Sequence, residues 1–232
     1  RTWVSILWIS ICGGILATFF YTSSLSYVNY IDLSVVVLLQ KLQPLFAITL
    51  AAVILKEPLS KKFLVLAVTA IFGSFLVTFG FQPIAYWNDK MIIAALLALL
   101  AAFCWGSSTV LGKHALKHIS FQIITSLRLT ITSLVCLAVI VTSNDILMIK
   151  ELSTIQWKIL LVIPCSTGAV ALFIYYYGLN RLPASHATLY ELFWPFSAMC
   201  IDWFYRGRSL EPAQLFGAVL LLSSMIYLSK DN

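Results

Sequence analysis

The sequence predicts an all-α polytopic membrane protein with eight transmembrane helices, and three observations predict this class. Of the 232 residues, 61% are hydrophobic and only 10% are charged, whereas a typical soluble domain carries about 25% charged residues. The mean hydropathy is +0.95, and the interior of a soluble domain of this size is too small to bury so much apolar surface. The apolar residues also lie in long runs that are separated by short polar breaks.

The eight predicted helices follow from the length of these runs, because a membrane-spanning helix needs about 20 mostly apolar residues. Transmembrane β-strands would alternate in polarity, but runs such as 92–103 are apolar on every side. No connection is long enough to form an extramembrane domain, so we expect the function to lie inside the bundle. The predicted spans are 3–24, 33–55, 63–81, 92–110, 121–142, 156–179, 185–205 and 212–229.

This composition argues against a soluble enzyme, a nucleic-acid-binding protein and a disordered protein. The net charge is +6, but the 15 Lys and Arg residues are scattered and form no stripe that a phosphate backbone could follow. The five cysteines all lie in apolar runs without a Cys-x-x-Cys pair, which argues against a disulfide framework or a thiolate metal site. We expect no nucleic-acid partner, no metal and no cofactor.

The distribution of cations predicts the orientation, because cytoplasmic loops of membrane proteins carry an excess of Lys and Arg. With the N-terminus inside, eight cations lie on the cytoplasmic side and five outside, which predicts an inner-membrane protein with both termini cytoplasmic. The inside set is Arg1, Lys56, Lys61, Lys62, Lys113, Lys117, Arg181 and Lys230, and the outside set is Lys90, Lys150, Lys158, Arg206 and Arg208.

The first three and the last three predicted spans resemble each other in order and in content. In each set a Tyr-bearing helix precedes a helix with a central proline, Pro44 or Pro195, and a helix rich in small residues follows. Five spans separate the two proline helices, and an odd separation reverses the direction of the chain. Inverted repeats are typical of secondary transporters. At an offset of 151, Ser34, Leu38, Pro44 and Ala47 match Ser185, Leu189, Pro195 and Ala198, and at 154 Tyr21 and Leu25 match Tyr175 and Leu179.

The second repeat, 92–229, has five helices, whereas the first, 1–81, has three. We therefore predict a 5+5 helix transporter lacking its first two helices, and we expect the sequence to begin inside a longer protein. The motifs resemble those of the drug/metabolite transporter superfamily, specifically the EamA-like transporters with two five-helix repeats. They are Tyr21–Leu25, Gln40–Pro44, Lys56–Leu59, Trp105–Ser108, Tyr177–Leu179, Pro183–Ser185 and Glu191–Pro195.

Three ionisable residues lie inside predicted spans, where such groups are expensive and are functional candidates by default. Counted at 1.5 Å per residue, Lys41 lies ~12 Å from the outer boundary, while Arg128 and Glu191 lie ~10 Å and ~9 Å from the inner one. The shared depth predicts an ion pair between Arg128 and Glu191, with either a structural role or a role in substrate binding. Lys41 either faces the cavity, which its depth favours, or extends outward to the interface.

The other candidates lie in the central stretches of the two proline helices or carry aromatic rings with polar tips. A proline in a membrane helix frees a carbonyl group, which tends to line a cavity; the alternative is a simple kink. Trp105 and Tyr175 lie near span ends, where interface-belt residues are common, but the family resemblance implies a cavity position. The predicted substrate-binding set is Gln40, Lys41, Gln43, Pro44, Trp105, Arg128, Tyr175, Glu191, Trp194 and Pro195.

Two further patterns carry less functional information. Ala94, Ala98, Ala102 and Gly106 recur every four residues, which predicts close helix packing along this face. The pair His114 and His118 has the spacing of a metal site, but no Glu follows His114 as a metalloprotease motif requires.

The leading functional hypothesis is a secondary transporter that moves small organic metabolites across the bilayer by alternating access. The cavity is expected to suit amino acids or similar zwitterionic or amphiphilic solutes. Since no ATP-binding motif is present, transport would be coupled to a proton or solute gradient or be uncoupled. The alternative is a truncated or accessory membrane protein without independent transport. An enzyme is not expected, because no acid–base constellation stands out.

Overall fold

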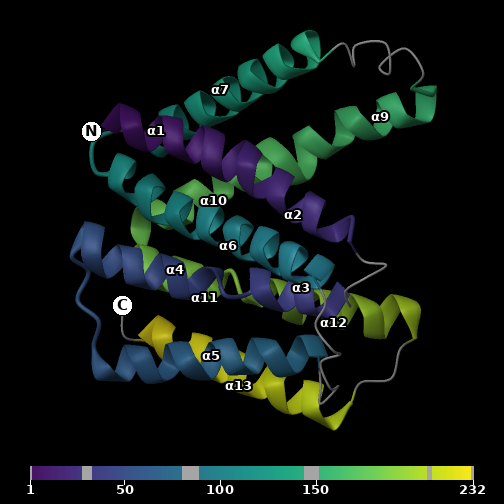
Figure 1. Ribbon diagram of the computed structural model, residues 1–232. Coiled ribbons are helices and arrows are strands. Elements are labelled where there is room, and N and C mark those ends of the chain that lie inside the picture. Colours follow the sequence, from purple (N-terminus) through teal and green to yellow (C-terminus); the bar gives the residue numbers. More distant parts are fainter. Residues whose placement is uncertain (1, 28–32, 80–88, 144–151, 208–210, 231–232) are drawn as a thin grey trace.

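The computed structural model of the chain describes residues 2–27, 33–79, 89–143, 152–207 and 211–230 (Figure 1). Every regular element within these ranges is a helix, which confirms the all-α class. The helices are α1 (Thr2–Ile11), η1 (Cys12–Leu16), α2 (Ala17–Leu25), α3 (Leu33–Gln40), α4 (Gln43–Leu50), η2 (Ala51–Leu55), α5 (Lys61–Phe79), α6 (Asp89–Leu116), α7 (Phe121–Thr142), α9 (Thr154–Ile163), η3 (Pro164–Gly168), α10 (Ala169–Arg181), α11 (Ala184–Tyr190), α12 (Phe193–Arg206) and α13 (Pro212–Lys230), where η denotes a π-helical turn.

Six of the eight predicted spans are single helices that are long and apolar enough to cross a membrane. The other two, 33–55 and 185–205, are interrupted near their centres, between α3 and α4 and between α11 and α12. The chain is therefore a multi-pass membrane protein with at least six such helices in its described part. The six are Thr2–Leu25, Lys61–Thr78, Ile92–Leu116, Phe121–Thr142, Thr154–Arg181 and Pro212–Lys230.

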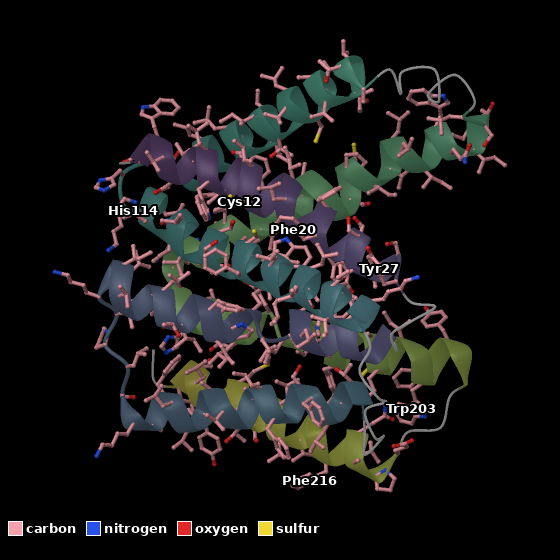
Figure 2. All side chains as sticks on the ribbon, in the orientation of Figure 1. Cys12, Phe20, Tyr27, His114, Trp203 and Phe216 are labelled. Carbon is pink, nitrogen blue, oxygen red and sulfur yellow. The ribbon has the colours of Figure 1, made fainter. Side chains whose placement is uncertain are left out.

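The beginning of α1 and the end of α13 lie at the same end of the bundle, here called the terminus end (Figure 1). His114 also lies at this end, whereas Tyr27 and Trp203 lie at the opposite end (Figure 2). Helices α5, α6, α10 and α13 begin or end near Lys61, Lys113, Arg181 and Lys230 at the terminus end. Cations that the sequence assigns to the cytoplasm are thus grouped, although Arg1, Lys150 and Arg208 lie outside the described residues.

Helix α6 occupies the centre of the bundle, where α1, α2, α3 and α4 pack against it. Its predicted small-residue face is confirmed, because Ala94, Ala98 and Ala102 are fully buried. A Cβ atom on Gly106 would lie 2.9 Å from the carbonyl oxygen of Gln43, so only glycine permits this approach of α6 to the start of α4. This contact holds α6 against one of the two interrupted helices.

The third helices of the two sets, α5 and α13, form the closest pair in the bundle (Figure 1). A Cβ atom on Gly73 would lie 2.8 Å from the carbonyl oxygen of Gly217, and one on Gly217 would lie 2.7 Å from that of Gly73. Small residues that allow such backbone approach are the usual means of joining helices in a bilayer. This pair supports the two interrupted helices from one side, through contacts with α3, α11 and α12.

Candidate functional site

A cavity with two adjoining lobes lies where the two interrupted helices meet α6. We call them the Trp194 lobe, of about 380 Å³, and the Arg128 lobe, of about 370 Å³. Cavities of roughly 300–1,000 Å³ are typical of small-molecule sites. Both lobes are lined by Gln40, Gln43, Trp105 and Glu191; the Trp194 lobe adds Tyr21, Lys41, Pro44, Thr188, Leu192 and Trp194, and the Arg128 lobe adds Ser108, Thr109, Arg128, Leu172 and Tyr175.

The interruptions in the two helices carry Lys41 and Glu191 to the cavity wall. At each break one N–H group bonds three residues back instead of four, from Leu42 to Leu39 at 3.2 Å and from Leu192 to Leu189 at 3.1 Å. The cause is the proline that follows each break, because it lacks an N–H group and its ring excludes the carbonyl four residues earlier. The prolines thus place a charged residue at a turn in the interior of each helix.

Glu191 is the centre of a hydrogen-bond network that joins four helical segments. Its carboxylate accepts a bond from the Gln43 amide at 2.5 Å and one from the Tyr175 hydroxyl at 2.9 Å. The hydroxyl of Thr109 lies 2.8 Å from that of Tyr175 and 3.5 Å from the carboxylate. Hydrogen bonds to a charged group are stronger than those between neutral groups, so this network ties α4, α6 and α10 to the break before α12.

The predicted ion pair between Arg128 and Glu191 is not formed. Arg128 instead donates to the hydroxyl of Tyr176 at 3.0 Å, and its guanidinium lies 5.7 Å from the centre of that ring. Successive residues of a helix point about 100° apart, so Tyr175 reaches Glu191 while Tyr176 reaches Arg128. The two opposite charges therefore face each other across the Arg128 lobe without direct contact.

Lys41 is buried, with 9% of its surface exposed, and it does not extend outward. Its ammonium lies 4.1 Å from the centre of the Trp194 ring, a cation–π contact that joins the break of one interrupted helix to the start of α12. Trp194 keeps 61% of its surface exposed. On the opposite wall, the rings of Tyr21 and Trp105 lie 5.6 Å apart. The Trp194 lobe thus combines flat aromatic faces with one ammonium group.

The structure brings nine of the ten predicted residues to the cavity walls. Pro195 is buried at the α12 break but does not line either lobe. The lining residues that we did not predict had signals in the sequence. Ser108 and Thr109 lie one turn after Trp105, Thr188 lies three residues before Glu191 on the same face, and Tyr21 is the repeat partner of Tyr175. That these residues bind a solute remains a prediction.

The sequence profile of the EamA-like transporter family matches residues 1–79 and 92–230. The chain belongs to this family. The predicted resemblance is thereby confirmed, and membership places the chain among multi-pass membrane transporters rather than enzymes.

Two curated relatives of this EamA-like protein differ in how much their names say. The chain is 38% identical over 225 residues to the riboflavin transporter ImpX of Fusobacterium nucleatum subsp. nucleatum, covering 97% of this chain and 75% of that protein. It is 28% identical over 194 residues to protein PecM of Dickeya dadantii, covering 83% of this chain and 63% of that protein.

A solved crystal structure shares the fold with this EamA-like chain. The two superpose with a TM-score of 0.74 at 14% sequence identity, over 96% of this chain and 75% of the other. At this identity the likeness shows the fold alone.

Proposed function

We propose that the protein transports a flat heteroaromatic metabolite of the riboflavin type, and that the two-lobed cavity holds it. The observation that carries the proposal is the Trp194 lobe, where Trp194, Trp105 and Tyr21 offer aromatic faces on opposite walls. Aromatic rings stack on such faces. The name of the ImpX relative supports the same class of solute.

The polar groups of the Trp194 lobe suit the edge of a heteroaromatic ring. The amides of Gln40 and Gln43 each offer a donor and an acceptor. Thr188 is fully buried, and its hydroxyl has no hydrogen-bond partner. Buried polar groups are nearly always paired, so the Thr188 hydroxyl is available to the carbonyl and N–H groups of such a ring.

Amino acids are the second candidate, because Lys41 and Glu191 line the same lobe and match the carboxylate and ammonium of a zwitterion. Two observations weaken this candidate. The Glu191 carboxylate already accepts bonds from Gln43 and Tyr175, and the Lys41 ammonium already contacts the Trp194 ring. A zwitterion would have to displace these partners, whereas a flat ring would not.

We propose that both interrupted helices also cross the membrane, which gives eight spans, and that transport proceeds by alternating access. At the terminus end the Glu57 carboxylate accepts bonds from the Ala184 N–H, the Ser185 N–H and the Ser185 hydroxyl at 2.8, 3.0 and 2.6 Å. Helix α4 also packs on α11, whereas α3 and α12 share no comparable packing among the described residues. The cavity would thus be closed toward the terminus end and open toward the other.

The cations grouped at the terminus end support a cytoplasmic position for both termini, in a cell inner membrane. With this orientation the state described above is open to the outside. Coupling to a proton gradient would run through Glu191, which is the one carboxylate among the residues that line the two lobes.

The proposal of an inverted 5+5 repeat is supported by two matching π-helical turns, η1 and η3, in the helices 2–25 and 154–181. A Cβ atom on Gly14, beside η1, would lie 2.6 Å from the hydroxyl of Thr132 in α7, but one on Gly168 would meet only atoms of its own helix. Gly168 is the match of Gly14 at an offset of 154. The second face is therefore open to helices equivalent to α6 and α7.

The test is solute uptake into liposomes that contain the purified protein. We expect riboflavin uptake above empty liposomes, and we expect Trp194→Ala and Gln40→Ala each to reduce it by about tenfold, since a stacked ring or a polar contact contributes about 1 kcal/mol or more. The matched control is Trp157→Ala, because Trp157 is also an exposed tryptophan but lies on α9, away from the cavity.

Two results would contradict the proposal. Uptake of amino acids but not of riboflavin would favour the second candidate. No uptake of any solute by a correctly inserted protein would favour the alternative of an accessory membrane protein without independent transport.

A further inference from the structure

The two lobes of the cavity differ in chemistry. Of the five residues that line only the Arg128 lobe, Leu172 alone lacks a polar group. The Trp194 lobe instead has Trp194, Pro44 and Leu192 in its own walls. The shared residues Gln40, Gln43, Trp105 and Glu191 form the boundary between the lobes. A solute that fills both would need an apolar flat part and a separate hydrophilic part.

The walls of the Arg128 lobe have unused hydrogen-bonding capacity. A guanidinium carries five N–H donors, and within the described part of the chain Arg128 uses one of them, toward Tyr176. Ser108 donates its proton to the Cys104 carbonyl at 2.7 Å, which leaves the lone pairs of its oxygen to accept bonds. The lobe therefore presents donors on one wall and acceptors on another, and hydroxyl groups can satisfy both.

The charges of the lobe favour a neutral ligand. The Arg128 guanidinium is balanced across the lobe by the Glu191 carboxylate, so an added phosphate would lie near a negative charge in a medium of low dielectric constant. A chain of hydroxyl groups would make hydrogen bonds to both charged groups without this repulsion.

We propose that the Arg128 lobe binds the polyhydroxylated chain of a solute whose flat ring lies in the Trp194 lobe. This inference rests on the proposed function, and it adds the orientation of the solute and the residues that select for its chain. Riboflavin has this two-part form, an isoalloxazine ring that carries a ribityl chain. Ser108, Arg128 and Leu172 would then discriminate between solutes with the same ring and different substituents.

The test is equilibrium binding of two probes to the purified protein, riboflavin and lumiflavin, which has a methyl group in place of the ribityl chain. We expect riboflavin to bind at least about tenfold more tightly, because each hydrogen bond to the chain contributes about two- to tenfold. Ser108→Ala removes an acceptor and Leu172→Phe narrows the lobe. Each should weaken riboflavin binding about three- to tenfold and leave lumiflavin binding unchanged.

The matched control is Ser166→Ala. The Ser166 hydroxyl bonds a carbonyl four residues earlier, that of Val162 at 2.8 Å, just as Ser108 does, but Ser166 is exposed on η3. This variant should bind both probes as the parent does.

Each other outcome identifies what is wrong. Equal binding of riboflavin and lumiflavin by the parent would overturn this inference and leave the proposed function intact, as would an equal loss of both probes in Ser108→Ala. Tighter binding of riboflavin 5′-phosphate than of riboflavin would make the lobe an anion site and overturn the assignment to a neutral chain. Binding of no flavin at all would overturn the proposed function and this inference with it.

Discussion

Replacing Glu191 with alanine is expected to lower the melting temperature by about 5–15 °C and to abolish solute uptake. The change leaves Gln43 and Tyr175 without the carboxylate that accepts their hydrogen bonds. Each unpaired buried donor costs about 1–3 kcal/mol, and in a chain of this length each kcal/mol corresponds to about 2–4 °C. The measurements are thermal unfolding of the detergent-solubilised protein and uptake into liposomes.

The control is Glu191→Gln, which keeps the size of the side chain and can still bond Tyr175 and Gln43 after an amide rotation. We expect its melting temperature to stay close to that of the parent, while uptake falls because the charge is lost. A Glu191→Ala protein with parental stability and uptake would show that the network around Glu191 neither holds the helices together nor serves transport.

Replacing Glu57 with alanine is expected to open the terminus end of the cavity. The carboxylate accepts three hydrogen bonds from Ala184 and Ser185 at the start of α11, and these bonds join the two interrupted helices at this end. Their loss would shift the population from the state open at the opposite end toward one open at the terminus end. A cysteine at Gln40 would then be labelled by a membrane-impermeant thiol reagent from the terminus end, about tenfold faster than in the parent.

Two controls accompany the Glu57 experiment. Glu57→Gln keeps an acceptor for Ser185 and should give an intermediate rate, whereas Glu211→Ala removes an exposed carboxylate at the start of α13 and should change nothing. If Glu57→Ala and the parent are labelled equally from both ends, Glu57 stabilises the fold without controlling access.

Much of the fold could be predicted because it depends on local properties of the chain. The lengths of the apolar runs give the helices, and the spacing of Ala94, Ala98 and Ala102 gives the buried face of α6. Windows of hydrophobicity could not reveal the interruptions at Lys41 and Glu191, because two residues in a turn barely change the average of a long apolar run. Pro44 and Pro195 were the local signal for them.

The candidate site was predicted less completely, because depth along a helix does not fix the direction of a side chain. Arg128 and Glu191 do line one lobe, but Tyr176 takes the guanidinium and Tyr175 takes the carboxylate. Thr188 was missed because a helical threonine usually bonds its own backbone, and only the structure shows that its hydroxyl lacks a partner. No residue pattern pointed to a flavin rather than an amino acid, since the same amides and aromatic rings suit both.

The central claim is that a riboflavin-type solute occupies the cavity between the interrupted helices. Its most direct test is riboflavin protection of a single cysteine at Gln40, introduced after the five native cysteines are replaced, against labelling by an impermeant thiol reagent. The account predicts labelling from the end opposite the termini and a slower rate when riboflavin is present, with no such protection for a cysteine at Trp157. Labelling at Gln40 that riboflavin does not slow, in a protein that still transports riboflavin, would place the solute elsewhere and contradict the account.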